Sequence, residues 1–304
     1  MVNMLKQEAK AHGDRLQVIP VERLQDLKDG IAKFKSEYEL NSFQQWIVND
    51  MYQLSVPESD FSIRSILLLA LPHPPYAKVE FYRAGTRYQF LSLVMSDLNH
   101  AKQYLKNLLE PEGYHILPAG ELPMKRLAAS CGLAEYGRNN ICYVEGMGSN
   151  FLFNAYYSDL PAEDIPWSMP KLSATCNGCS ICIKACPTGA IRKDVFLIDN
   201  ERCLSALNEM PNPFPEWLPS SVHHTLYDCL RCQEGCPMNR GYQESHIGPV
   251  IFDEEETNAI LAGNTYDSFD SSLKEKSDLL GMTQWLAAIP RNLRILMDNY
   301  NEQV

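Results

Sequence analysis

The feature that most constrains this chain is a dense run of cysteines, "CNGCSICIKACPTGA", at residues 176–190. Its spacing is C-x2-C-x2-C-x3-C-P, which places four thiols and a proline in one short stretch. A second group, C-x2-C-x3-C-P, begins at Cys229 and is one cysteine short of the first. Eight of the ten cysteines lie between Cys176 and Cys236. Such crowding indicates metal ligation, or disulfides in a secreted module.

The first spacing is the one that bacterial ferredoxins use to hold 4Fe-4S clusters. Three close thiolates take three corners of one cube, and the cysteine before the proline crosses to a second cube. Cys203, in "NERCLSALNE", supplies the thiol that the second group lacks. The crossing rule then assigns two ligand sets. The first cluster takes Cys176, Cys179, Cys182 and Cys236, and the second takes Cys186, Cys203, Cys229 and Cys232.

Zinc is the main competing interpretation, because paired C-x2-C knuckles form tetrahedral zinc sites. A third cysteine at the same spacing and a fourth before a proline exceed what one tetrahedral ion requires, so two clusters are favoured. Pro187 and Pro237 would turn the chain away after the last ligand of each group, and Gly178 would let the backbone approach a cluster closely. Cys131 and Cys142 are predicted to be small core residues.

The N-terminal sequence "MVNMLKQEAKAHGDRLQ" is polar and lacks the apolar core of a secretory signal. No window approaches the ~18 uninterrupted apolar residues of a membrane span. We therefore expect a cytoplasmic protein with no membrane span, in a reducing compartment that argues against disulfides. The formal charge of −11 opposes unspecific attraction to a phosphate backbone or an anionic lipid surface. Nucleic acid is accordingly not expected as the main partner.

The sequence before residue 165 predicts a mixed α/β domain. The bounded apolar run at 65–71 is typical of a buried strand, whereas residues 43–54 and 88–109 have apolar residues at helical spacing. A shorter helix is predicted at 124–131. The segments "NICYVEG" and "FLFNAYYSD", on either side of two glycines, predict a β-hairpin.

The sequence after this part changes character. Residues 160–174 carry three prolines and little periodicity, which predicts a linker into the cysteine-rich part. Beyond the cysteines, residues 253–263 have an acidic first turn and a closing glycine, which predict a short helix. The tail at 285–300 also has a helical pattern, with Pro290 tolerated only at a boundary or a kink.

With these motifs, the chain resembles the epoxyqueuosine reductase family, corrinoid-dependent iron–sulfur enzymes related to reductive dehalogenases. The likeness rests on "CNGCSICIKACPTGAI", "ERCLSALNE" and "YDCLRCQEGCPMNR", in the order and approximate spacing that the family uses. It extends more loosely to "IRSILLLALPHPPY", "FYRAGTRYQF" and "LAASCGLAEYGRNNICYVEGMGSNFLF". Together these segments cover most of residues 40–300.

The resemblance implies an α+β fold in three parts. A nitroreductase-like α/β domain of the cobalamin type spans residues 1–165 and is the candidate corrinoid or substrate domain. A ferredoxin-like domain at 166–245 holds two 4Fe-4S clusters, and a helical segment at 246–304 packs on the core. Electrons from a flavodoxin, a ferredoxin or a reductase would pass singly through the clusters to base-off cobalamin. The protein would supply placement, exclusion of water and proton donors.

Three departures from the family pattern concern the proton donor and the substrate. An ungapped alignment puts Pro118 where the family has a catalytic aspartate, and a two-residue gap puts Gly120 there with Glu121 beside it. The family's "GLGW-x-GK" segment reads "GLAEYGR", with Ala134 and Glu135 in place of glycine and tryptophan. The chain also stops at residue 304 without the helical-repeat extension with which many members bind tRNA. Because of this end and the charge, we do not expect tRNA as the substrate.

The matched segments also supply the candidate site residues. Candidate proton donors are Tyr136, Tyr88 and Glu121, since related dehalogenases use a tyrosine as an acid. Candidate corrinoid contacts, in a polar stretch with glycines, are Arg138, Asn139, Gly148 and Ser149. Adjacent His223 and His224 would point about 100° apart on a helix, so exposed or capping roles are expected rather than joint metal ligation.

The sequence leaves three functions open. The first, which we expect, is an iron–sulfur oxidoreductase that passes single electrons to a bound corrinoid and reduces a small, non-tRNA substrate. The second is an electron-transfer or corrinoid-reducing protein without a substrate of its own, which the lost aspartate favours. The third keeps the epoxyqueuosine reaction with a replaced proton donor.

Overall fold

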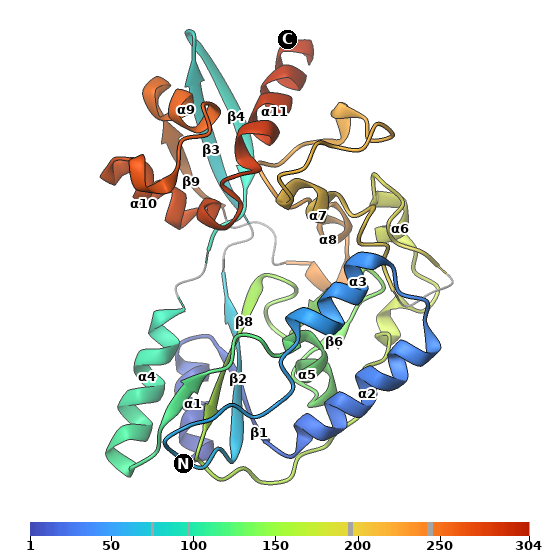
Figure 1. The fold of residues 1–304 in the computed structure, drawn as a ribbon, viewed down its shortest axis with the longest axis vertical. Helices are drawn as coiled ribbons and strands as arrows, with labels where there is room; N and C mark the ends of the chain where they lie inside the picture. The colour runs from blue at the N-terminus through green and yellow to red at the C-terminus, as the bar shows by residue number, and fades with distance from the viewer. Residues whose placement is uncertain (74–75, 96–97, 194–196, 242–245, 304) are drawn as a thin grey trace. The chain divides into compact units, whose positions relative to one another are not determined.

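The computed structural model describes residues 1–73, 76–95, 98–193, 197–241 and 246–303. The chain forms two compact units that interleave along the sequence (Figure 1). The first unit contains Met1–Pro72 and Ser96–Cys179, and the second contains His73–Met95 and Ser180–Val304. The functional division of the sequence at residues 165 and 245 stays a prediction.

A four-stranded antiparallel sheet lies at the centre of the first unit. Its order is β1 (Arg15–Pro20), β2 (Ser65–Pro72), β8 (Phe151–Ser158) and β5 (Ile116–Pro118). Six successive apolar residues of β2, from Ile66 to Leu71, are fully buried, so both faces of this strand are covered. Covered faces explain why β2 is uniformly apolar rather than alternating, and the predicted buried strand is confirmed.

Helices supply the cover on the sheet of the first unit. α1 (Val2–Ala11) and α4 (Asn99–Leu109) pack on one face, where Leu5 and Leu105 share an apolar cluster with Leu67 of β2. The unit also contains α2 (Arg23–Glu37), α3 (Ser42–Trp46), a π-helical turn (Ile47–Met51), the 3-10 turn Glu110–Glu112 and α5 (Met124–Ser130). The helices predicted at 43–54 and 124–131 are thus confirmed with shorter bounds.

The predicted hairpin between "NICYVEG" and "FLFNAYYSD" is wrong. β7 (Cys142–Tyr143) pairs with β6 (Glu135–Tyr136), whereas β8 pairs with β2 and β5 in the main sheet. The turn between β7 and β8 is closed by one bridge, from Val144 to Gly148. Alternation along the sequence identifies strands, but tertiary packing decides their partners.

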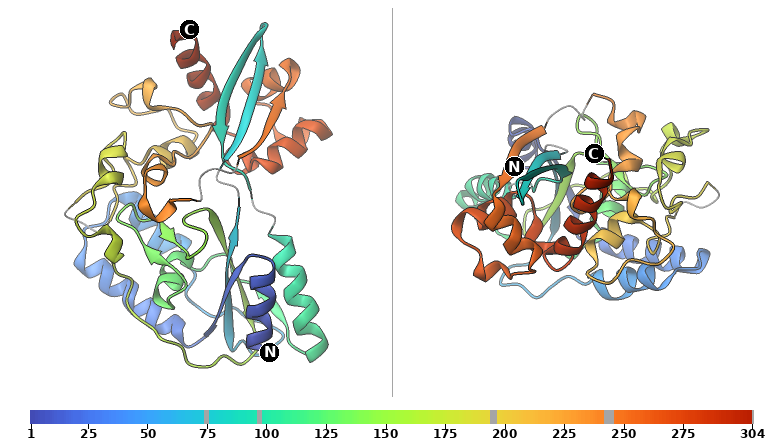
Figure 2. Two further views of the ribbon diagram at one scale, coloured as in Figure 1. Left: turned by 180° about the vertical axis from the view of Figure 1, so that it is seen from behind. Right: turned by 90° about the horizontal axis from the view of Figure 1, so that it is seen from above.

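A three-stranded sheet forms the second unit with helices around it. Its order is β4 (Thr86–Ser92), β3 (Tyr76–Arg83) and β9 (His246–Phe252). β3 and β4 form an antiparallel hairpin, and β9 lies parallel to β3, as Figure 2 shows from behind. The rings of Phe81 and Phe252 stack in its core with centroids 4.5 Å apart.

Three helices follow β9 in the second unit: α9 (Glu254–Leu261), α10 (Ser271–Leu279) and α11 (Ile289–Gln303). Asp253 and Glu256 form a capping box at the start of α9, as the acidic first turn predicted. Pro290 lies in the first turn of α11, where a missing N–H costs no helical hydrogen bond. Both predicted C-terminal helices are confirmed.

The helix predicted at 88–109 is wrong in its first half. Residues up to Ser92 belong to β4, and α4 begins only at Asn99. Tyr88 and Phe90 alternate as strand residues and pack against Tyr300 in the core of the second unit. Apolar residues two apart at 88 and 90 fit a strand as well as a helix, and the pairing with β3 decides for the strand.

Short helical turns carry most of the cysteine-rich part. They are Ala174–Cys176, α6 (Ile181–Ala185), α7 (Leu204–Glu209), Ser220–Val222, α8 (Arg231–Glu234) and Pro237–Asn239. Two further 3-10 turns, Tyr266–Ser268 and Met282–Trp285, lie outside this part, among the C-terminal helices. Among the helices in the described ranges, none has the length and apolarity needed to cross a membrane.

Candidate metal centre

The predicted ligands lie at the ends of short helices. Cys186 is the residue after α6, Cys203 is the N-cap of α7, and Cys236 precedes the turn Pro237–Asn239. All ten cysteines lie in the described ranges, and none of them forms a disulfide. Gly178 has φ +74°, a conformation that a glycine adopts without strain, so the turn itself requires it.

The backbone around Cys229 is strained. Asp228 and Leu230, its two neighbours, have φ values of +60° and +53°. Residues other than glycine rarely adopt this region, and such conformations persist where the surrounding structure enforces them, often at functional sites. The strain lies where the second cysteine group begins.

Three thiols of the second ligand set lie close to one another. Burial raises the pKa of Cys229 to about 12, and negative charge on Cys203 or Cys186 raises it too. Burial likewise raises the pKa of Cys203, and the N–H groups of Ala206 and Ser205 that face its sulfur act in the opposite direction. Because metal ligands are thiolates, a cluster would displace these protons on binding. N–H groups that donate to sulfur are the kind that tune iron–sulfur potentials.

The four-ligand set of the first cluster stays a prediction. Cys176 and Cys179 belong to the first unit, and Cys182 and Cys236 belong to the second. Cys176 is buried, and the backbone N–H of Arg138 donates to its sulfur at 3.4 Å. Nη2 of Arg138 also donates to the carbonyl oxygen of Cys176, at 3.2 Å.

The chemistry of this donor set fits iron–sulfur clusters, because every predicted ligand is a thiol and Cys186, Cys203 and Cys229 are neighbours. In the part of the chain that the structure describes, no three His, Cys, Asp or Glu side chains gather closely enough to hold one metal ion. A cube spreads its ligands over four iron corners instead of drawing them around a single atom.

The three candidate proton donors are in different surroundings. Tyr136 is 6% exposed and hydrogen-bonds the Cys142 thiol, and burial raises its pKa well above the usual range. Tyr88 is 7% exposed and belongs to the other unit. Glu121 is exposed in the segment between β5 and α5, and its charge raises the pKa of Tyr157 beyond the effect of burial.

The four candidate corrinoid contacts lie close together in sequence but have local roles. Asn139 is 3% exposed, and its amide donates to the Tyr143 hydroxyl at 2.8 Å. Arg138 contacts Cys176, and Gly148 has φ +60° in the turn closed by Val144. Ser149 is half-buried. The role of corrinoid contacts that the resemblance gave these residues stays a prediction.

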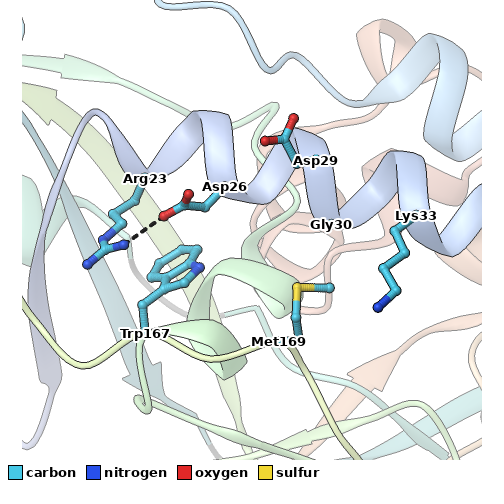
Figure 3. Close-up of a pocket in the computed structure, with 7 residues that line it drawn as sticks. All are labelled: Arg23, Asp26, Asp29, Gly30, Lys33, Trp167 and Met169. Carbon is cyan, nitrogen blue, oxygen red and sulfur yellow. Dashed lines mark hydrogen bonds and ion pairs between the residues drawn. The ribbon is translucent and has the colours of Figure 1, made fainter.

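A pocket of about 430 Å³ lies elsewhere, along α2 (Figure 3). It is lined by Arg23, Asp26, Asp29, Gly30, Lys33, Trp167 and Met169. Arg23 donates to Asp26 at 2.7 Å and to Asp164 at 2.6 Å. The pocket contains none of the predicted site residues. The guanidinium of Arg23 is already paired with Asp26 and Asp164.

Sequence analysis missed a half-buried pair of carboxyl groups beside the second ligand set. The Ser205 hydroxyl lies 2.6 Å from Asp228 Oδ1 and 2.9 Å from Glu209 Oε1. Burial raises the pKa of Glu209 to about 9, and the charge of Asp228 raises it further. Burial raises the pKa of Asp228 as well. Single acidic residues about 20 positions apart give no signal in the sequence that could have identified this pair.

His223 is buried, so the exposed role expected for it is wrong. It is 6% exposed and packs against Phe214, with ring centroids 4.4 Å apart. Burial, with the charges of Arg291 and His224, lowers its pKa to about 4. His224 has the expected capping role, because its ring nitrogens contact the carbonyl oxygens of Val222 and Cys229.

We expect the folded protein to lose stability as the pH falls from about 6.5 to 4, because the unfolded His223 takes up a proton that the folded one excludes. Over the whole window the loss is at most roughly 3 kcal/mol. Urea unfolding of His223→Gln at pH 7.5, 6.5 and 5.5 should show a flatter dependence than the unsubstituted protein. An unchanged slope in His223→Gln would contradict this assignment.

Comparison with known proteins identifies a matching domain family and several proteins of similar sequence. Residues 175–239 match the family model described as a 4Fe-4S double cluster binding domain. The epoxyqueuosine reductase of Aliivibrio fischeri is 30% identical over 237 residues, which cover 75% of this chain and 60% of that protein. The enzyme of Bacillus subtilis is 25% identical over 275 residues, covering 84% and 68%. That of Francisella cf. novicida is 29% identical over 165 residues, covering 54% and 44%.

Solved structures agree in fold. An epoxyqueuosine reductase crystallised with an epoxyqueuosine-modified tRNA-Tyr stem loop has a TM-score of 0.65 and 20% identity, and covers 98% of this chain and 81% of its own. The Bacillus subtilis enzyme has a TM-score of 0.63 and 19% identity over the same shares. The chain spans between 44 and 68% of the length of the three relatives named above. It therefore has the mixed α+β fold of epoxyqueuosine reductase structures, is similar in sequence to those enzymes, and contains a 4Fe-4S double cluster binding domain.

Proposed function

We propose that this protein reduces epoxyqueuosine in tRNA to queuosine, with electrons delivered through two 4Fe-4S clusters. The observation that carries the proposal is that two similarities occur in the same chain. Residues 175–239 match the double-cluster model, and relatives named epoxyqueuosine reductases align with up to 86% of the chain.

This proposal corrects the expectation of a small, non-tRNA substrate. That expectation is wrong, because the relatives are named for epoxyqueuosine, and a structural neighbour was solved with a modified tRNA stem loop. The findings favour the third hypothesis, the epoxyqueuosine reaction with a replaced proton donor.

The inference from net charge failed because a sum over the chain says little about one surface. Ten acidic and four basic residues fall in 246–304, so this segment alone supplies −6 of the formal −11. A bound tRNA stem loop would interact with the charged side chains near it and not with the net charge of the chain. Salt screens interactions between exposed charges that are more than about 10 Å apart at ordinary ionic strength.

The proposed reaction removes the epoxide oxygen. Both carbon–oxygen bonds break, a carbon–carbon double bond forms, and the oxygen leaves as water after uptake of two electrons and two protons. Each cluster passes one electron at a time, and the reductant is a low-potential donor such as a flavodoxin, a ferredoxin or a reductase. The protein must therefore supply a proton near the epoxide.

Glu121 is the donor that we favour among the three candidates. A proton donor must come within hydrogen-bond reach of the atom it protonates. Glu121 is exposed, whereas Tyr136 and Tyr88 are enclosed by packing at 6 and 7% exposure. Its segment is also where alignment with the family puts the missing aspartate, at Pro118 without a gap or at Gly120, beside Glu121, with a two-residue gap.

The resemblance further implies base-off cobalamin, which in related enzymes would accept the electrons. Asn139 hydrogen-bonds Tyr143 and Arg138 hydrogen-bonds Cys176 in this chain, and their role as corrinoid contacts stays a prediction. We therefore assign no step through cobalamin. Adding it to the assay below tests that part separately.

The test is conversion of an epoxyqueuosine-containing tRNA stem loop by anaerobically purified, iron-loaded protein with a chemical reductant, with and without added cobalamin. Mass spectrometry of the digested RNA should show queuosine, and Cys203→Ala should abolish the product. Protein with full iron that binds no stem loop and forms no queuosine in either condition would overturn the proposal.

A further inference from the structure

We propose that the first turn of α11 positions the ligands of the second cluster, through Arg291 and Asn292. This inference rests on the double-cluster domain and not on the identity of the substrate. The second cluster is the set Cys186, Cys203, Cys229 and Cys232. All residues in the argument belong to the second unit.

Asn292 ties together the two segments that carry Cys203 and Cys229. It is 1% exposed, and its amide nitrogen donates to the carbonyl oxygens of Asn208 at 2.8 Å and Leu226 at 3.0 Å. Asn208 is in α7, which begins directly after Cys203, and Leu226 is three residues before Cys229. Both amide hydrogens are thus used to fix one segment against the other.

A second amide strengthens the same link. The side chain of Asn208, which is fully buried, donates to the carbonyl oxygen of Asp228 at 2.8 Å. Asp228 has the strained φ of +60° beside Cys229. The hydrogen bonds from Asn292 to Asn208 and from Asn208 to Asp228 therefore form a continuous path from α11 to the residue next to a ligand.

Arg291 holds the other end of α7. Its Nη2 donates to the carbonyl oxygen of Leu207 at 2.9 Å, and its Nη1 donates to that of Asn212. The guanidinium also donates to Asn292 Oδ1 and lies over the ring of Phe214 at 3.6 Å. A cation at the carbonyl end of a helix satisfies acceptors that the helix leaves open.

The position of α7 matters because its N-terminus faces a ligand. The N–H groups of Ser205 and Ala206 face the sulfur of Cys203. α7 has six residues, so its two ends are only about 9 Å apart and a shift at one end reaches the other. Hydrogen bonds to the sulfurs and the groups that orient the ligands set cluster potential and retention. Arg291 and Asn292 are positioning residues in this sense.

The test compares Arg291→Lys and Asn292→Ala with a matched control. The control is Arg294→Lys. Arg294 is on the same helix, and its guanidinium donates to the carbonyl oxygen of Leu261 and not to α7. The readouts on anaerobically purified protein are iron per chain, the electron paramagnetic resonance signals of the two reduced clusters, their midpoint potentials, and the rate of iron release to a chelator. Cys203→Ala identifies which signal belongs to the second cluster.

We expect Arg291→Lys and Asn292→Ala to shift the midpoint of the second cluster and to speed release of its iron about tenfold or more. The first cluster should be unchanged in both variants, and both clusters should be unchanged in Arg294→Lys. Arg291→Lys keeps the charge, so it answers the question even where Asn292→Ala fails to fold. Unchanged clusters in Arg291→Lys, or equal changes in both clusters, would overturn the inference. These readouts need no tRNA, so failure of the proposed reaction leaves them interpretable.

Discussion

Replacing Cys203 by alanine is expected to halve the iron content of the anaerobically purified protein, from about eight to about four irons per chain. Cys203 is the ligand that does not belong to either compact cysteine group, and three ligands alone hold a cube poorly. Iron and acid-labile sulfide analysis measures the loss. Electron paramagnetic resonance of the reduced protein should keep one cluster signal and lose the other.

Cys131→Ala and Cys142→Ala are the matched controls for this substitution. Both thiols are buried, at 8 and 3% exposure, and burial raises their pKa to about 11 and 12. Neither belongs to a predicted ligand set, so each variant should retain about eight irons. Full iron in Cys203→Ala, or equal losses in the three variants, would show that Cys203 is not a ligand.

Glu121→Gln is expected to slow the single-turnover conversion of the stem loop by about 100-fold or more, because general acid catalysis contributes roughly 10²–10⁴ in rate. The amide is nearly the same size as the carboxyl group but cannot supply the proton. Iron content and stem-loop affinity should remain as in the unsubstituted protein. Rapid-quench assays followed by mass spectrometry of the nucleoside measure the effect.

Three variants control for this result. Glu145→Gln removes another exposed carboxyl group of the first unit and should leave the rate unchanged. Tyr136→Phe and Tyr88→Phe remove hydroxyl groups from enclosed tyrosines and should have little effect on the rate. A large loss in Tyr136→Phe with normal rates in Glu121→Gln would transfer the donor role to Tyr136.

The double-cluster domain could be predicted from the sequence because the information in its cysteine spacing is local. Three thiols within seven positions, from Cys176 to Cys182, must come close together in any fold, and the spacing before Pro187 is specific. The single distant ligand, Cys203, was predicted by counting the missing thiol. The neighbourhood of Cys203, Cys186 and Cys229 agrees with that assignment.

The features that sequence analysis missed depend on contacts between distant segments. Glu209 and Asp228 become a pair bridged by Ser205 only when α7 packs against the segment before Cys229. Tyr88 became a strand residue because β3 pairs with β4, although its neighbours also fit a helical pattern. The role of Arg291 depends on carbonyl groups about 80 positions earlier. Such contacts leave no periodicity or motif in the sequence.

The interleaving of the two units has a consequence for how the protein is made. On the ribosome, the β3–β4 hairpin emerges long before β9, and Ala84 donates a hydrogen bond to Glu254 from 170 positions away. At 5–20 residues per second, translation takes on the order of ten seconds to span that interval. During that time one edge of β3 has no neighbouring strand, so the nascent chain is exposed to wrong pairing and to capture by chaperones until β9 has been synthesised.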